Sequence, residues 1–280
     1  MYSVKILKDS MNILGDRLTT WEIEYPRIVH SEVMTMREAS RNAASSRAIP
    51  LSKLRERILR DPVVPVHFGK NQKGMQAREQ VEDTEAARQW WLDGLDLMAA
   101  HHRRGEELGI HKQIVNRVIE PWMFITVIFS ATNFENMFFL RYHPDAQPEF
   151  EWLARTMYEA YRAAESSVQV LQPGEWHLPF INDEDRMLGI ADQKKLSAAR
   201  CGRVSYLTHA GKREIEEDFR LHDDLCGINR GADEPLHMSP FEHVAMALGE
   251  SKRVGNFTGF MQYRKEFQGE AGPKRFTPKP

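Results

Sequence analysis

The first clear hydrophobic pattern lies near the beginning of the chain. Trp21, Ile23 and Tyr25 alternate with polar residues, and a period of two is typical of a strand buried on one face. We therefore predict strand structure within the first 25 residues. Pro26 should end it, because proline donates no hydrogen bond to a sheet.

Beyond this strand, apolar residues recur at spacings of three and four. Val29, Val33 and Met36 follow this rule, which predicts a helix from Ile28 to about residue 47, ended by Pro50. Further helices are expected over 82–107, 110–119, 147–168, about 184–200, 212–226 and, as a short amphipathic piece, 256–265. Short strands are expected over 203–207 and, as the last strand, over 244–248.

Few short strands among long helices indicate an α/β fold, in which a mixed or antiparallel sheet packs with long helices. Proline, glycine and asparagine mark 61–76 as a loop and 172–183 as a connector. Residues 269–280 are expected to be a disordered tail.

Composition and charge exclude several classes of protein. The chain has 280 residues, 41% apolar and 28% charged, which excludes a disordered chain or a fibre. With 38 basic and 40 acidic residues, it has no basic field to hold nucleic acid. Its two cysteines are too few for a disulfide scaffold and fit a cytoplasmic location. The longest apolar run, 121–131, is too short to span a membrane.

The densest polar cluster lies between Arg37 and Arg47 and holds three arginines, three serines and one asparagine. Planar guanidinium groups beside small hydroxyls, such as Ser45, Ser46 and Arg47, suit a phosphate monoester. A solvated helix face with surface ion pairs is the alternative interpretation.

Arg117 and Arg141 adjoin apolar sequence, and so does Asn136. Such an arginine either extends its charged end to water or binds an anionic ligand. A buried asparagine needs hydrogen-bond partners, and a ligand is one of them.

We predict no metal site. His237 and His243 lie six residues apart with Glu242 between them, but Pro240 interrupts the helix that zinc-protease spacing requires. The cysteines are interpreted as buried, inert thiols.

Together these residues resemble the motifs of the flavin-dependent thymidylate synthases, in particular the phage-encoded branch. The family's first motifs stand late in this chain, as Arg-Val-Ser-Tyr at 203–206 and Ser-Pro-Phe-Glu-His at 239–243. Its next motifs stand early, as the strand over 18–25 and the Arg, Ser, Asn, Ser and Arg of 37–47 at the family spacing. The chain therefore resembles a circular permutant, with 172–190 joining the family's old ends.

The family's later motifs follow in their usual order. Arg117 to Pro121 match its Arg-x-x-x-Pro, and Asn136, Leu140–Arg141 and 146–149 match its Asn, Leu-Arg and Ala-Gln-x-Glu. The resemblance covers most of the chain, apart from an insertion at 50–105 and the last 30 residues. Because both motif sets must meet in one site, we interpret 1–280 as a single domain.

The resemblance implies a role for each matched residue. Arg141 would be catalytic, lying at the pyrimidine edge and stabilising negative charge on the ring during attack from C5. Together with Arg141, the substrate side would comprise Glu32, Ser45, Ser46, Arg47 and Arg117. The flavin side would comprise Arg37, Asn42, Ser130, Asn136, Ser205, His237, Ser239 and Glu242.

The implied reaction is reductive methylation of dUMP to dTMP. The implied cofactors are FAD, NADPH, which supplies a hydride, and methylenetetrahydrofolate, which supplies the one-carbon unit. No cysteine nucleophile is used. The family forms homotetramers whose active sites combine residues of several subunits, and neither nucleic acid nor a membrane is an expected partner.

The chain also departs from the family. Thr35-Met36-Arg37 replaces Arg-His-Arg, and Ala43 replaces an acid. Ser130 and Thr132 stand where the family has Asn and Arg. Two alternatives remain open: a pyrimidine deoxynucleotide hydroxymethylase or dCMP-directed variant for modified phage DNA, and a non-catalytic nucleotide- or flavin-binding relative. Glu32, in place of a glutamine, motivates the dCMP variant, because a carboxylate accepts a hydrogen bond from an amino group.

Overall fold

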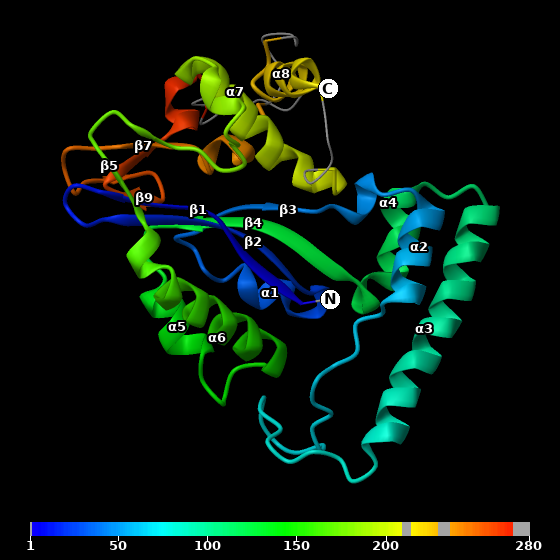
Figure 1. Ribbon diagram of the computed structural model, residues 1–280. Helices are drawn as coiled ribbons and strands as arrows, with labels where there is room; N and C mark the ends of the chain where they lie inside the picture. The colour runs from blue at the N-terminus through cyan, green and yellow to red at the C-terminus, as the bar shows by residue number, and fades with distance from the viewer. Residues whose placement is uncertain (1, 209–213, 229–235, 271–280) are drawn as a thin grey trace.

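A computed structural model of the protein describes residues 2–208, 214–228 and 236–270, so most of the predicted tail lies outside the described residues. A five-stranded sheet of order β3-β4-β2-β1-β5 crosses the middle of the molecule (Figure 1). Helices α5 and α6 lie below it in this view, and α7 and α8 above it. The predicted α/β fold with a mixed sheet is confirmed.

Four strands of this sheet are antiparallel neighbours, and the fifth, β5, runs parallel to β1. The strands are β1 (Ser3–Asn12), β2 (Arg17–Pro26), β3 (Ser40–Ala43), β4 (Phe124–Ala131) and β5 (Gln169–Leu171).

The hairpin of β1 and β2 confirms the strand predicted near the beginning of the chain, including its end at Pro26. Trp21, Ile23 and Tyr25 are fully or almost fully buried, as their alternation predicted. Gly15 allows the tight turn between the strands, because its φ of +91° is a conformation that side chains rarely adopt.

The helix predicted from Ile28 to residue 47 is wrong over most of its length. Helical structure ends with α1 (His30–Val33), and β3 follows. The turn between them is stabilised by Arg41 of β3, which donates hydrogen bonds to the carbonyls of Met34 (2.9 Å) and Met36 (2.8 Å). β3 then pairs antiparallel with the fully buried β4, and this ladder outweighs the local helical spacing.

Helices α5 (Glu135–Arg141) and α6 (Pro148–Ala163) cover one face of the sheet. They share an apolar core with β2 and β4, whose largest buried side chains include Trp21, Phe129, Phe134 and Phe150. No helix within the described residues is long and apolar enough to cross a membrane.

The insertion and the segment that follows it form a second, smaller core beside the sheet. The helices of this part of the chain are α2 (Leu51–Arg60), α3 (Thr84–Glu107), α4 (Lys112–Val115) and the 3-10 helix η3 (Asn116–Trp122). The predicted loop over 61–76 and helix over 82–107 are confirmed, whereas the helix predicted over 110–119 is divided between α4 and η3. Trp90 on α3 is 69% exposed.

The other face of the sheet is covered by the later part of the chain. This layer contains α7 (Ile190–Gly202), η6 (Arg203–Tyr206), α8 (Ile215–Leu225) and η7 (Ser239–Glu242). A second sheet of order β10-β7-β6 joins β10 (Phe260–Gln262), β7 (Ala245–Ala247) and β6 (Trp176–His177), beside a hairpin of β8 (Arg253–Val254) and β9 (Phe257–Thr258). Further 3-10 turns are η1 (Arg27–Val29), η2 (Ser46–Ala48), η4 (Glu165–Ser167), η5 (Asp185–Met187) and η8 (Tyr263–Glu266).

Three predictions fail in this layer. The strand predicted over 203–207 is instead the 3-10 helix η6, β7 is not the last strand, and the helix predicted over 256–265 is β9, β10 and η8. Gly255 and Gly259 have φ of +63° and +72°, so tight turns divide this segment before a helix can form.

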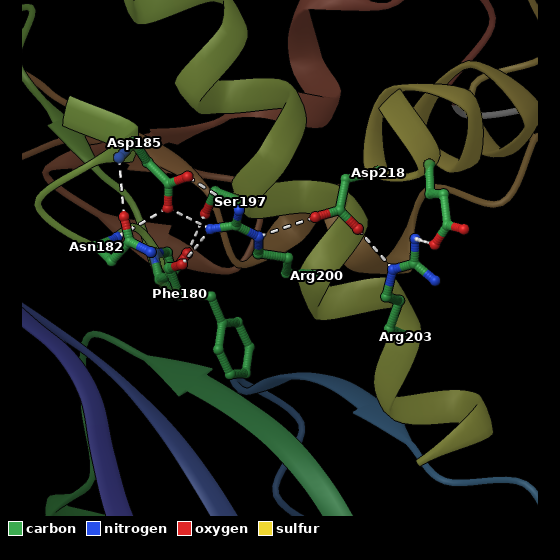
Figure 2. Close-up of polar contacts among 9 residues, drawn as sticks. Phe180, Asn182, Asp185, Ser197, Arg200, Arg203 and Asp218 are labelled. Atoms are coloured by element: carbon green, nitrogen blue, oxygen red, sulfur yellow. Dashed lines mark hydrogen bonds and ion pairs between the residues drawn. The ribbon is translucent and has the colours of Figure 1, made fainter. Parts of the chain in front are cut away.

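A buried ion network joins the connector to α7 and α8 (Figure 2). Arg200 donates to both carboxylate oxygens of Asp185 and, through Nε, to Asp218 (3.0 Å). Arg203 donates through Nε to the other oxygen of Asp218 (2.6 Å). Although burial acts in the opposite direction, the hydrogen bonds from Arg200 lower the pKa of Asp185. Because the aspartate side chains are only 4% and 1% exposed, their pairing is essential to this layer.

Candidate functional site

A pocket of about 640 Å³ lies between α5 and the segment that leads into β3. Three residues predicted for the site, Arg37, Asn136 and Arg141, line it together. The other lining residues are Thr35, Met36, Glu38, Asn133, Met137, Leu140, Phe150 and Arg253.

The antiparallel pairing of β3 with β4 explains why residues a hundred positions apart meet here. Ser40, the first residue of β3, pairs with Ser130 near the end of β4. Arg37, which precedes β3, therefore lies at the end of the sheet where β4 leads into Asn133 and α5.

The pocket carries an excess of positive charge. Its single carboxylate, Glu38, pairs with Arg253 (3.0 Å). The guanidinium of Arg141 lies 5.0 Å from the centre of the Phe150 ring and donates to Thr35 Oγ1 (3.3 Å). Among the described residues, no carboxylate lies within 4.0 Å of Arg141 or Arg37. Both guanidinium groups are therefore available to an anionic ligand.

The remaining wall of the pocket combines apolar surface with two amides. Met36, Met137 and Leu140 supply the apolar surface, and Asn133 and Asn136 supply donors and acceptors. A ligand that unites a flat ring, amide-like edges and negative charge matches this lining.

The second group of predicted residues lies at the opposite end of β3 and β4 and comprises Ser45, Ser46, Arg47 and Arg117. The hydroxyl of Ser46 donates to Glu120 (2.5 Å), which also pairs with Arg27 (3.0 Å) and Arg117 (3.6 Å). Arg47 is exposed, with no carboxylate within 4.0 Å in the described part of the chain. This end therefore holds a free guanidinium beside hydroxyl groups, which suits a phosphate.

The length of β4 separates the two groups. Arg117 lies in η3, before the strand, and Arg141 ends α5, after it. Eight strand residues at about 3.3 Å each span about 26 Å. The two groups therefore lie at opposite ends of β4 within one chain.

A third group lies on the face of β3 that η6 and η7 cover. Asn42 donates from Nδ2 to the carbonyl of Cys201 (2.7 Å) and accepts from the hydroxyl of Ser239 (3.4 Å). The carbonyl of Ser205 accepts from the backbone N–H of Ser45 (3.1 Å). The structure thus brings Asn42, Ser205 and Ser239 to one junction, although their motifs lie at opposite ends of the chain.

Ser130 belongs to a buried chain of hydrogen bonds between the two sheets. Its hydroxyl bonds to Thr20 (2.6 Å) and to Nδ1 of His243 (2.8 Å), and Thr20 bonds to Nε2 of His177 (2.8 Å). Nδ1 of His177 bonds to the Ser10 hydroxyl (2.9 Å). Burial lowers the pKa of His243 to about 3 and that of His177 well below its usual value, so both rings are neutral. Both Ser130 hydrogen bonds are internal, so its hydroxyl supports His243 rather than facing a pocket.

Two other residues predicted for the flavin side have partners within their own layer. Glu242 pairs with Arg264. His237 is exposed, and its backbone N–H donates to the carbonyl of Leu225 (2.9 Å). Neither residue lines the 640 Å³ pocket.

Glu32 lies in α1, just before the segment that leads to the pocket. Its carboxylate accepts from the Ser31 hydroxyl (3.0 Å), and its carbonyl accepts from the hydroxyl of Thr35 (2.6 Å). Thr35 also accepts from Arg141, so Glu32 is one hydrogen-bonded residue away from Arg141.

Sequence reasoning missed Arg253 and Phe150. Arg253 comes from the β8–β9 hairpin and lines the pocket, where it pairs with Glu38. No sequence motif includes it. Phe150 directly follows the Ala-Gln-Pro-Glu match at 146–149, so the motif pointed to its neighbourhood but not to its contact with Arg141.

One group of residues has the composition of a metal site. The ligand atoms of His222, Asp223 and Cys226 lie within 4.8 Å of one another. However, His222 is already bonded to Asp223 through Nδ1 (2.8 Å) and to the Tyr263 hydroxyl through Nε2 (3.3 Å). The geometry is therefore explained by hydrogen bonds alone.

Comparison with known proteins gives matches of structure only. No protein-family model matches the chain, and no curated protein matches it. Similar solved structures include a UMP/dUMP methylase, PolB from Streptomyces cacaoi, bound with 5-Br UMP (14% identity, TM-score 0.45) or 5-Br dUMP (15% identity, TM-score 0.47). These matches cover 58% of this chain and 89% and 90% of the other.

Another similar structure is thymidylate synthase X (ThyX) from Helicobacter pylori with FAD and dUMP. It is 18% identical with a TM-score of 0.38, and the match covers 51% of this chain and 67% of that one.

Proposed function

We propose that this protein catalyses the flavin- and folate-dependent reductive methylation of dUMP to dTMP, with NADPH as the source of hydride. The observation that carries this proposal is the pocket in which Arg37, Asn136 and Arg141 meet. These residues come from separate motifs of the resemblance, and the β3–β4 register brings them together.

The residues of the pocket fit a flavin. The guanidinium of Arg37 suits an anionic group, the amide of Asn136 suits a ring edge, and Met36 and Met137 suit a flat ring. When bound, FAD would supply the redox chemistry by which hydride passes from NADPH to the product. The Asn42–Ser239 junction is the second place where residues expected at the flavin meet.

Arg141 has the central role in the proposed mechanism. As the pyrimidine C5 attacks the one-carbon unit, negative charge develops on the ring oxygens. A guanidinium at this edge stabilises that negative charge. The stabilisation is greatest where no carboxylate neutralises the guanidinium. Phe150 and Thr35 hold the Arg141 side chain in position for this role.

The phosphate would be bound by the second group, with Arg47 as a bidentate donor and Ser45 and Ser46 beside it. Because β4 separates this group from Arg141 by about 26 Å, we propose that the active site is shared between chains. A homotetramer with shared sites, as the resemblance implies, satisfies this requirement.

We also propose that the chain is a circular permutant of the family. The connector leaves β5, forms β6 and η5, and enters α7, so it joins the main sheet to the layer that carries Ser205 and Ser239. The buried ion pair of Arg200 with Asp185 fixes the end of this connector on α7 (Figure 2).

The proposal is tested by turnover. Purified protein is incubated with FAD, NADPH, methylenetetrahydrofolate and dUMP, and NADPH oxidation is followed. Arg141→Ala should abolish oxidation coupled to product, whereas the control Arg162→Ala, on the exposed side of α6, should retain it. A folded Arg141→Ala protein with full activity would contradict the proposal.

A second candidate function follows from Glu32. The backbone carbonyl of Glu32 accepts from Thr35, which contacts Arg141, so Glu32 lies next to this part of the site. A carboxylate at this position would favour a pyrimidine with a donor amino group, which makes dCMP the alternative substrate. Product from dCMP and none from dUMP would establish this variant.

A further inference from the structure

Helix α3 carries an exposed stripe that no other described residue covers. Trp90 and Leu97 are each 69% exposed, seven residues apart on the same side of the helix. Asp93, Ala100 and Arg104 are also exposed and continue this side at spacings of three and four. Isolated apolar side chains on a surface are common. Exposed side chains at spacings of three, four and seven along one helix are instead typical of a surface that pairs with another helix.

The opposite side of α3 packs against its own chain. Leu95, Ala99 and His102 are buried, and Gly94 and Gly105 lie close to Trp122 and Val115. The helix is therefore fixed by its inner side, and the stripe is a rigid surface. With 24 residues it is about 36 Å long, enough for a contact of several turns.

The stripe is complementary to itself. A two-fold rotation about a point between residues 98 and 99 places a second α3 antiparallel to the first. Leu97 then lies opposite Ala100 of the second copy, and Asp93 lies opposite its Arg104. Trp90 lies opposite Glu107, which can accept a hydrogen bond from the indole N–H. Each contact occurs twice, and each unites apolar groups, opposite charges, or a donor with an acceptor.

The present partners of these charged residues are exposed and weak. Arg104 pairs with Glu107 on its own helix (3.1 Å), and both side chains are more than half exposed. Asp93 accepts from Gln89 (2.7 Å), also on the surface. Exchanging these contacts for intermolecular ones therefore costs little.

We propose that the exposed stripe of α3 binds a second copy of this chain in an antiparallel helix pair. Leu97 and Ala100 form the centre, and two Asp93–Arg104 ion pairs set the register. The alternating charges within the stripe favour a second copy over a membrane surface. This interface lies in the insertion and does not depend on the proposed enzymatic activity.

The test measures the mass of the full-length protein in solution by light scattering over a range of concentrations. Leu97→Asp should halve the mass of the particle. The control Met187→Asp changes a side chain that is 87% exposed on η5 and should leave the mass unchanged. An unchanged mass for folded Leu97→Asp would overturn the proposal.

A charge exchange tests the register. Asp93→Arg and Arg104→Asp should each weaken association about tenfold, since each places like charges opposite one another twice. The double variant Asp93→Arg/Arg104→Asp restores opposite charges between copies and should recover the wild-type association. Failure of the double variant to associate better than either single variant would also overturn the proposal.

Discussion

Acidification should destabilise the fold through two buried histidines, His243 and His177. Both are 0% exposed, and burial lowers the pKa of His243 to about 3 and that of His177 well below its ordinary value. In the unfolded chain, where water surrounds the ring, a histidine has a pKa of about 6.5. Between these values the unfolded state binds more protons, so stability is lost as the pH falls below about 6.5. At pH 5 this linkage costs about 2 kcal/mol for His243, and His177 adds a cost of the same sign.

The variant His243→Asn isolates one of these contributions, because asparagine can hydrogen-bond to Ser130 but does not titrate. Urea denaturation at pH 7.5 and pH 5 gives the free energy of unfolding for each protein. Between these two conditions wild type should lose about 2 kcal/mol more than His243→Asn. The control His101→Asn, exposed on α3, should lose as much as wild type. Equal losses in wild type and His243→Asn would refute a neutral His243 in the folded state.

Three further predictions concern the ion network, the pocket and a turn. Asp218→Ala leaves Arg200 and Arg203 without their shared carboxylate and should lower the free energy of unfolding by about 3 kcal/mol in urea at pH 7.5. Arg253→Ala removes a cation from the pocket and should weaken dUMP or FAD binding about tenfold by calorimetry, with the melting temperature unchanged. Gly259→Ala places a Cβ 2.2 Å from Asp16 Oδ2 at a φ of +72° and should lower the melting temperature far more than Gly174→Ala, where the φ is +92° but nothing lies within 4 Å.

The β1–β2 hairpin was predictable from sequence because its alternation is strict and one face is buried. β3 was not, because Ser40–Ala43 contains no large apolar residue and becomes a strand only through pairing with β4, more than eighty residues later. The helix that this spacing suggested is interrupted by a turn, where Arg41 donates to the carbonyls of Met34 and Met36. Long-range pairing of this kind leaves no local pattern.

For the site, the motifs predicted residue types but not their grouping. Arg37, Asn136 and Arg141 meet because the β3–β4 register brings the start of β3 to the end of β4. In the same register Arg47 follows β3 and Arg117 precedes β4, so both lie at the opposite end of these two strands. Sequence spacing alone could not reveal that division. Prediction of such a site therefore needs the strand pairing as well as the motifs.

The most direct test of the proposed function is mass spectrometry of the nucleotide after incubation with FAD, NADPH, methylenetetrahydrofolate and either dUMP or dCMP. The proposed mechanism predicts that dUMP gains one methyl group at C5 and that this product disappears with Arg141→Ala. Unchanged dUMP and dCMP, in the presence of folded wild-type protein, would contradict it.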